Sequence, residues 1–227
     1  MSNIPKIKVS QVVWGYLLQP DSYFSYVEKI NQLYCEIHGY EYVVERLEHH
    51  GQTDRHPHWA KVKHLERMLY DCDYLFFIDA DACFYSHGIA IHNEILPRFL
   101  EGKNIMMASD CAAEKIMTNP KVPNTGMVLL RNNDRTKQLI AEWDTICYIP
   151  GWEHTKHVWT VEQKAVIYIQ KKYPDEFQLE REYYLLNNRY GFFVKHYADG
   201  QGANKFENFK EIYHSPIMER NRKLLQR

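Results

Sequence analysis

Two aspartates, Asp79 and Asp81, stand directly after the most hydrophobic segment of the chain, 74–78. Two carboxylates this close repel each other unless a positive charge lies beside or between them. A hard divalent cation with oxygen ligands is a natural partner, and such cations commonly also hold substrate phosphates. The Asp-x-Asp pair therefore predicts a metal or substrate site, although a bare pair of this kind is often only a solvated turn.

The segments around this pair alternate between strand and helix patterns. Runs of β-branched and apolar residues predict strands at 7–14, 40–46, 73–77, 105–109 and 126–130. The last third is less regular, with segments at 180–186 and 192–196 before a Gly-rich turn. Apolar residues at helical spacing predict helices at 22–38, 59–70, 91–100, 134–146, 161–172 and from 216 onward. Asp21 or Ser22 is the expected N-cap of the first helix, Gly39 its C-terminal glycine and Ser215 the N-cap of the last.

This alternation predicts an α/β fold with three layers, α/β/α, around a mostly parallel, mixed central sheet. In such sheets the ligand crevice lies beyond the carboxyl ends of the strands. Asp79 and Asp81 are expected there, and because alternate residues of an extended chain share a face, both carboxylates should point the same way.

Length and composition limit the classes of protein to which this chain can belong. A chain of 227 residues, 45% of them hydrophobic, favours one large globular domain. With 28 basic and 29 acidic residues it lacks the positive excess of a protein that binds nucleic-acid phosphates. The aromatic content of 14% suits a sugar-binding cleft, but core packing is the more economical explanation.

Cysteines and targeting signals suggest a cellular compartment. The five cysteines are widely spaced and never form Cys-x-x-Cys, so we expect buried thiols in a reducing environment. No apolar run reaches the ~20 residues that span a bilayer, and the first residues do not form a signal peptide. These patterns predict a soluble, cytoplasmic chain without a transmembrane segment.

Several short motifs follow one another in a recognisable order. They are Trp59-Ala60-Lys61, Ile78-Asp79-Ala80-Asp81-Ala82, Asn124-Thr125-Gly126 before Leu129-Leu130-Arg131-Asn132, Trp143, Glu162-Gln163, Glu182-Tyr183-Tyr184-Leu185 and Phe193-Val194-Lys195-His196. In this order the chain resembles the nucleotide-sugar-dependent glycosyltransferases with the GT-A fold. It is most similar to the galactosyl-, xylosyl- and mannosyltransferase family of yeast and plant Golgi enzymes, over roughly residues 58–205.

The resemblance implies a single GT-A-like glycosyltransferase domain over 1–227, with a nucleotide-binding half at about 1–110 and an acceptor-side half at about 111–227. It implies a UDP-sugar donor, a Mn²⁺ or Mg²⁺ cofactor, a glycan or glycoprotein acceptor and retention of anomeric configuration. Carried over by motif, the metal ligands are Asp79, Asp81 and His196.

The same resemblance assigns the remaining site residues. Catalytic candidates are Asp79, Asp81, Glu162 and Lys205. Substrate-binding candidates are Trp14, Tyr16, Lys61, Asp79, Ala80, Asp110, Asn124, Gly126, Gln163, Gly202 and Lys205. We expect the two lysines to stabilise the departing diphosphate, and Glu162 or Asp110 to orient the acceptor or shield the cationic sugar. Gln163 and Asn124 are plausible partners for sugar hydroxyls, and a turn at Gly200 and Gly202 is suited to close over the diphosphate.

One departure and two alternatives stay open. The family has its lysine soon after the histidine, whereas Lys205 follows His196 only after eight other residues, which puts its role in question. A phosphohydrolase of the haloacid dehalogenase type also carries Asp-x-Asp after a strand, but in those enzymes the motif opens the domain and is followed two residues later by Thr or Val. In this chain a complete strand-helix-strand unit precedes the motif, and Cys83 stands where that Thr or Val would be. A non-catalytic sugar-nucleotide-binding or scaffold domain is the other alternative.

The sugar, the acceptor linkage and the oligomeric state are not indicated by these residues. The absence of the family's usual membrane anchor suggests a cytosolic, viral or bacterial enzyme, or a domain of a longer protein.

Overall fold

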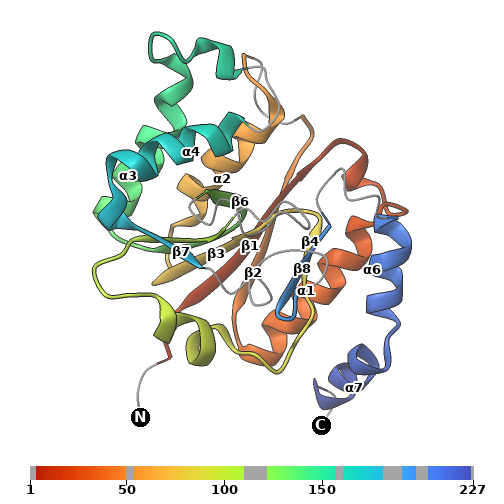
Figure 1. Ribbon diagram of the computed structural model, residues 1–227. Coiled ribbons are helices and arrows are strands. Elements are labelled where there is room, and N and C mark those ends of the chain that lie inside the picture. Colours follow the sequence, from red (N-terminus) through yellow and green to blue (C-terminus); the bar gives the residue numbers. More distant parts are fainter. Residues whose placement is uncertain are drawn as a thin grey trace.

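The central sheet of the protein is built from strands that are far apart in the chain. The computed structural model describes residues 4–49, 54–109, 122–156, 161–180, 191–197 and 204–225. Within these ranges six strands form one sheet in the order β2-β1-β3-β6-β5-β7, and β4 and β8 form a separate two-stranded ribbon (Figure 1). The strands are β1 (Ile7–Trp14), β2 (Glu41–Leu47), β3 (Tyr74–Ile78), β4 (Ala82–Phe84), β5 (Ile105–Ser109), β6 (Pro123–Arg131), β7 (Phe177–Glu180) and β8 (Val194–His196).

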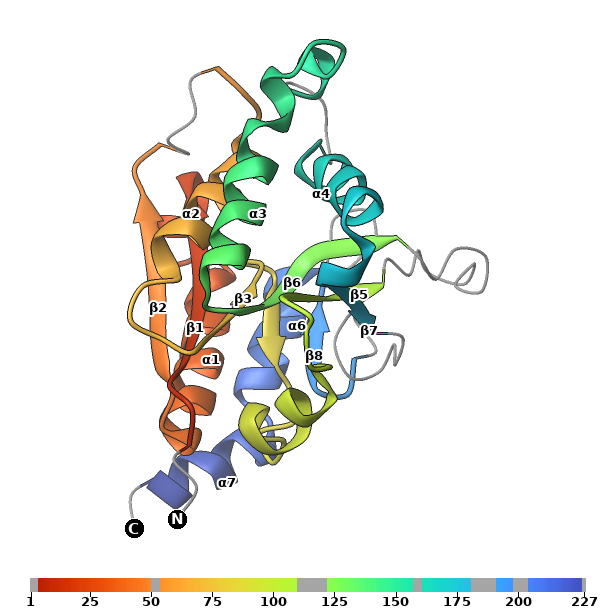
Figure 2. The ribbon, with the colours of Figure 1, turned by 90° about the vertical axis from the view of Figure 1, so that its left-hand side faces the viewer.

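The large sheet is mixed and mostly parallel, as predicted. β1 pairs in parallel with β2 and β3, and β5 pairs in parallel with β7. Among the described strands of this sheet, only β6 is antiparallel to both of its neighbours, β3 and β5. The edges of the sheet, β2 and β7, lie at opposite sides of the molecule in Figure 2.

Helices cover both faces of the sheet and complete three layers. They are α1 (Phe24–His38), α2 (Ala60–Met68), α3 (Asp134–Thr145), α4 (Val161–Lys172), α6 (Lys205–Tyr213) and α7 (Pro216–Leu225). α2, α3 and α4 lie together on one face, whereas α1, α6 and α7 lie on the other with the β4–β8 ribbon (Figure 1). The α/β fold class is confirmed.

Strand β3 is almost continuously apolar because both of its faces are buried at the centre of the sheet. Successive side chains of a strand point to opposite faces. Leu75 and Phe77 pack into the cluster under α2, α3 and α4, while Phe76 and Ile78 pack into the cluster on the opposite face. The largest fully buried side chains include many aromatic ones, so much of the aromatic content fills the core, as expected.

The helix ends are partly as predicted. α1 ends at Gly39, which has a left-handed backbone (φ 69°), and Ser215 caps α7 through a hydrogen bond to the amide of Met218 (3.4 Å). The predicted cap of α1 is wrong. The helix begins at Phe24, and Ser22 instead donates to the carbonyl of Leu17 (2.9 Å), one turn earlier.

Other elements differ from the sequence prediction. The helix expected at 91–100 is a π-helical turn, Ile91–Ile95, followed by a 3₁₀ turn, Leu96–Arg98, because Pro97 has no amide hydrogen to continue the helix. The short strands β4, β7 and β8 and helix α6 were not predicted.

Two sequence-based expectations concern thiols and membranes. The cysteines in the described ranges, Cys35, Cys72, Cys83 and Cys147, are buried and free, as expected, and Cys111 lies outside those ranges. Among the helices described, none combines the length and hydrophobicity needed to cross a membrane.

Candidate active site

The Asp-x-Asp pair forms a turn at the carboxyl end of β3. The amide of Ala82 donates to the carbonyl of Asp79 (3.0 Å), which closes the turn before the chain enters β4. We call Asp79-Ala80-Asp81 the D-x-D turn. We expected the alternation of side chains along a strand to align the two carboxylates. This reason is wrong, because a turn rather than an extended segment brings them together.

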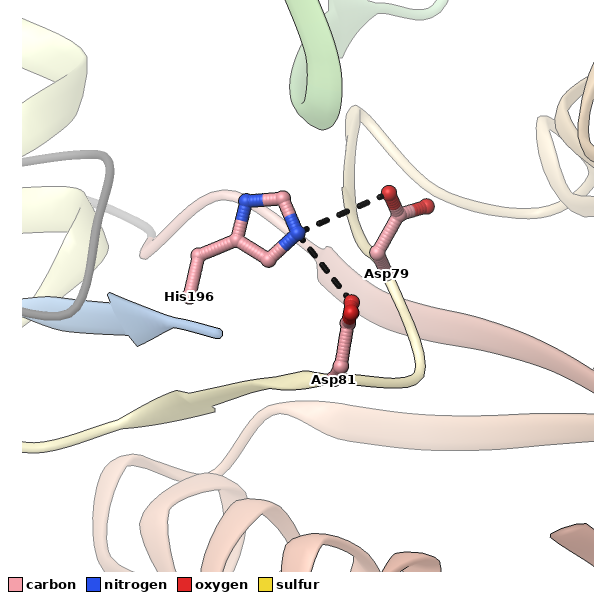
Figure 3. A group of neighbouring side chains, drawn as sticks. All are labelled: Asp79, Asp81 and His196. Atoms are coloured by element: carbon pink, nitrogen blue, oxygen red, sulfur yellow. Dashed lines mark hydrogen bonds and ion pairs between the residues drawn. The ribbon is translucent and has the colours of Figure 1, made fainter. Parts of the chain in front are cut away.

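Strand pairing brings His196 to this turn from far along the chain. His196 is the last residue of β8 and lies opposite Ala82, the first residue of β4. Next to it, the amide of Tyr197 donates to the carbonyl of Asp81 (2.9 Å). The Nε2 atom of His196 therefore lies 3.1 Å from Oδ1 of Asp81 and 3.8 Å from Oδ2 of Asp79 (Figure 3).

A glycine on β6 leaves room for this imidazole. A Cβ atom at Gly126 would contact Cε1 of His196 and lie 2.8 Å from its Nδ1. The pairing of β6 with β5 is interrupted here, because Met107 lies opposite Val128 whereas Ala108 lies opposite Asn124. Such bulges commonly redirect side chains next to active sites. The bulge thus sets Gly126 against the histidine.

Two lysines flank the aspartates. Nζ of Lys61, from α2, lies 2.8 Å from Oδ1 of Asp79, and Nζ of Lys205, the first residue of α6, lies 2.8 Å from Oδ2 of Asp81. Lys205 thus lies at the D-x-D turn despite its distance from His196 in the sequence, and its role stays a prediction.

The charges in this cluster shift one another's pKa values. Burial raises the pKa of Asp81, but the His196 imidazole and the Lys205 ammonium outweigh it and hold that pKa well below its usual range. Burial lowers the pKa of His196, but Asp81 and Asp79 reverse the effect and raise it. Burial also lowers the pKa of Lys61, and Asp79 and Glu162 raise it by more.

The Asp79, Asp81 and His196 side chains fit a divalent cation. Each offers one ligand atom, and these atoms all lie within 4.8 Å of one another. Neighbouring ligand atoms of an octahedral shell of about 2.1 Å radius lie about 3 Å apart, so the separations of 3.1 and 3.8 Å need little adjustment. Two carboxylates and one imidazole suit Mn²⁺ better than Ca²⁺.

A second charged group lies beyond Lys61. Glu162, near the start of α4, accepts a hydrogen bond from Thr125 at Oε1 (3.0 Å), and Lys61 lies 3.6 Å from the same oxygen. Its Oε2 accepts no hydrogen bond within the described part of the chain, and His58 Nδ1 lies 3.6 Å away. Burial raises the pKa of Glu162, but Lys61 and His58 more than offset this and lower it to about 2.

These groups line one pocket of about 460 Å³ at the carboxyl ends of β1 and β3. Every predicted site residue within the described ranges lies on its wall: Trp14, Tyr16, Lys61, Asp79, Ala80, Asp81, Asn124, Gly126, Glu162, Gln163, His196 and Lys205. Asp110, Gly200 and Gly202 lie outside the described residues. The fold thus brings the candidates together, and their individual roles stay predictions.

The sequence prediction missed three polar or aromatic residues of the same wall: His58, Tyr23 and Thr125. Thr125 is the middle residue of the Asn124-Thr125-Gly126 motif, and His58 directly precedes Trp59-Ala60-Lys61. Their adjacency to those motifs was the available signal. Nothing in the sequence marks Tyr23, whose ring lies 5.6 Å from the Lys205 ammonium.

Comparison with known proteins decides the family. The model of the nucleotide-diphospho-sugar transferase family matches residues 23–201. The chain belongs to this family. The match includes the D-x-D turn, Glu162 and His196, and it therefore makes the chain a glycosyltransferase with a sugar-nucleotide donor.

Solved structures show the same fold. This transferase superposes on a glycosyltransferase involved in the glycosylation of the major capsid of PBCV-1 with a TM-score of 0.65 and 15% identity, covering 93% of this chain and 100% of the other. For the glycosyltransferase GlyE of Streptococcus pneumoniae TIGR4 the TM-score is 0.59 with 10% identity, covering 98% of this chain and 64% of the other. No curated protein matches the chain at a significant level. The closer relation to yeast and plant Golgi enzymes stays a prediction.

Proposed function

We propose that this transferase moves a sugar from a UDP-sugar to a hydroxyl of a glycan or glycoprotein acceptor, with retention of configuration and with Mn²⁺ or Mg²⁺ as cofactor. The convergence of Asp79, Asp81 and His196 on the wall of the pocket is the observation that carries the proposal. Uridine and retention come from the resemblance to the Golgi family, and the cation comes from the ligand set.

The reaction first requires stabilisation of the negative charge that develops on the leaving diphosphate. A divalent cation held by Asp79, Asp81 and His196 supplies Lewis-acid stabilisation of that charge when it is bound. Lys205 and Lys61 add fixed positive charge on either side of the D-x-D turn. Fixed charges of this kind raise the rate because they act where charge develops in the transition state.

The reaction also requires stabilisation of the positive charge that develops on the sugar. Glu162 remains ionised because Lys61 and His58 lower its pKa to about 2, and its Oε2 is left without a hydrogen bond among the described residues. We assign to this carboxylate the shielding of the cationic sugar or the orientation of the acceptor hydroxyl. A weak base suffices for either role, since a retaining transfer needs no strong base in the protein.

The remaining wall residues bind and orient. Gln163 and Asn124 supply amide groups for sugar hydroxyls, and Trp14 and Tyr16 supply aromatic surface at the end of β1. Tyr16 is 67% exposed, so its ring is accessible to a ligand. Holding the donor and acceptor in line removes an entropic barrier of up to several kcal/mol. We place the acceptor on the side of α4, in the half of the chain after about residue 110.

A panel of radiolabelled UDP-sugars, with Mn²⁺ or with EDTA, tests the proposal. We expect Mn²⁺-dependent donor binding by calorimetry and Mn²⁺-dependent labelling of an acceptor. His196→Ala should lose donor binding, whereas His154→Ala, an exposed histidine outside the pocket, should keep it.

The alternatives give different results in the same assay. Tight donor binding without transfer to any acceptor or to water indicates a non-catalytic binding domain. Release of inorganic phosphate through a covalent aspartyl intermediate indicates a phosphohydrolase. Either result contradicts the proposed transfer.

A further inference from the structure

A network of buried side-chain amides lies directly beneath the D-x-D turn. Gln11 on β1 and Asn31 on α1 are both fully buried, and Tyr42 on β2 reaches them from the edge of the sheet. Buried amide groups are costly unless they form hydrogen bonds, so their partners show what they are for.

The partners are backbone groups of the turn. Gln11 Nε2 donates to the carbonyl of Asp79 (2.8 Å) and lies 3.5 Å from that of Ala82. Asn31 Nδ2 donates to the carbonyl of Ala82 (3.2 Å), and its Oδ1 accepts from the amide of Phe84 (2.9 Å). The two amides therefore hold the chain at both ends of the turn.

Hydrogen bonds within the network also fix the orientation of the Gln11 side-chain amide. Oε1 of Gln11 accepts from Asn31 Nδ2 (3.0 Å) and from the hydroxyl of Tyr42 (2.5 Å). With both lone pairs of this oxygen engaged, the amide cannot rotate without breaking two hydrogen bonds. Gln11 is thus held with its nitrogen toward Asp79.

The topology explains why side chains are needed here. The chain leaves the large sheet after β3, and β4 pairs with β8 instead. Within the turn, the carbonyl of Asp79 accepts from the amide of Ala82 and that of Asp81 accepts from the amide of Tyr197. Gln11 and Asn31 add side-chain hydrogen bonds to the carbonyls of Asp79 and Ala82, where the regular pairing of β3 does not continue. Ser10, the neighbouring buried polar residue on β1, has no such partner within the described residues.

We propose that Gln11 and Asn31 are positioning residues that fix the D-x-D turn so that both aspartates face His196. Their hydrogen bonds to the turn segment reach backbone atoms, and they act through Asp79 and Asp81. The inference deepens the proposed function and rests on it only for the cation, because the geometry of the turn exists without a ligand.

Hydrogen exchange and cation binding test this role together. Gln11→Met and Asn31→Leu remove the hydrogen bonds and keep similar volume. Val9→Ala is the matched control, since Val9 is fully buried on the same strand, packs in the core cluster that includes Ala82 and Phe84, and has no polar side-chain atom that could hold the turn. Amide exchange by NMR at Ala82 and Phe84, and binding of Mn²⁺ alone by electron paramagnetic resonance, are measured for all three variants.

We expect exchange at Ala82 and Phe84 to accelerate by about tenfold or more in the two amide variants relative to Val9→Ala, and Mn²⁺ affinity to fall by about tenfold or more. Unchanged exchange, or unchanged Mn²⁺ affinity despite faster exchange, overturns the proposal. If the unaltered protein binds no Mn²⁺, the metal requirement of the proposed function fails. Exchange at the turn then decides the positioning role alone: acceleration supports it, and no change overturns it.

Discussion

Two buried histidines at opposite ends of the sheet have opposite electrostatic surroundings. His196 lies at the carboxyl end of β3 between two aspartates, and they raise its pKa. His87 lies near the amino end of β2, against the ring of Tyr34 and behind His38, whose Nε2 contacts its carbonyl (2.8 Å). Burial, with a further contribution from His38, lowers the pKa of His87 to about 4.

The contrast shows which features separate a binding histidine from a structural one. Both are almost fully buried, so burial does not distinguish them. In the part of the chain that the structure describes, no carboxylate forms an ion pair with His87 or His38, and Asp79, Asp81 and His196 form the only group of three potential metal ligands. The converging carboxylates and the pocket, rather than the histidine itself, identify the site.

The sharpest test of this contrast is removal of one key side chain at each end. Asp81→Asn removes the anion that pairs with Lys205 and the nearer of the two carboxylates beside His196, and should reduce transfer on the order of 10³-fold with the fold retained. His87→Asn should leave kcat and the KM for donor near those of the unaltered protein. Steady-state kinetics and circular dichroism measure both. Equal losses of activity in the two variants would contradict the contrast.

A matched pair of glycine substitutions gives the next largest effect. Gly126→Ala places a methyl group against the His196 ring, whereas Gly88, beside His87, has open space where a Cβ would lie and an ordinary backbone. We expect Gly126→Ala to lower Mn²⁺ affinity and to cost about 1–3 kcal/mol of stability from overpacking. Gly88→Ala should change neither quantity. Thermal denaturation and Mn²⁺ titration check the pair, and similar behaviour of both variants would show that the room at Gly126 is unimportant.

The smallest effect on activity is expected at the structural end, where the pH dependence of stability is tested. The unfolded chain binds a proton at His87 below about pH 6.5, whereas the folded protein does so only below about pH 4. The free energy of unfolding therefore falls as the pH drops between these values, by at most about 3 kcal/mol from this residue. In urea denaturation, His87→Asn should lose less stability than the unaltered protein over that range. Parallel pH profiles would disprove the low pKa.

Strong local patterns made much of the fold predictable. β3 and α4 were found because a central strand is apolar throughout and a packed helix has regular apolar spacing. The turn at 91–98 was mistaken for a helix because Pro97 disrupts an otherwise helical pattern. β4 and β8 are only three residues each and gain their stability from pairing with one another, a long-range effect that no local pattern reveals.

The candidate site was predicted by motif order rather than by physics alone. The aspartates and His196 were found because they match motifs, and the structure explains their meeting through the pairing of Ala82 with His196. Gln11 and Asn31 were missed, since a polar residue in a sequence carries no sign that it is buried. Their function appears only when the backbone of the turn is seen above them.

The most direct test of the account is anomalous diffraction from crystals soaked with Mn²⁺ and UDP. The account predicts a manganese peak bonded to Asp79, Asp81 and His196, with the diphosphate of UDP coordinated to the same ion. UDP bound in the pocket without a manganese peak between these three side chains, or manganese bound only elsewhere, would contradict it.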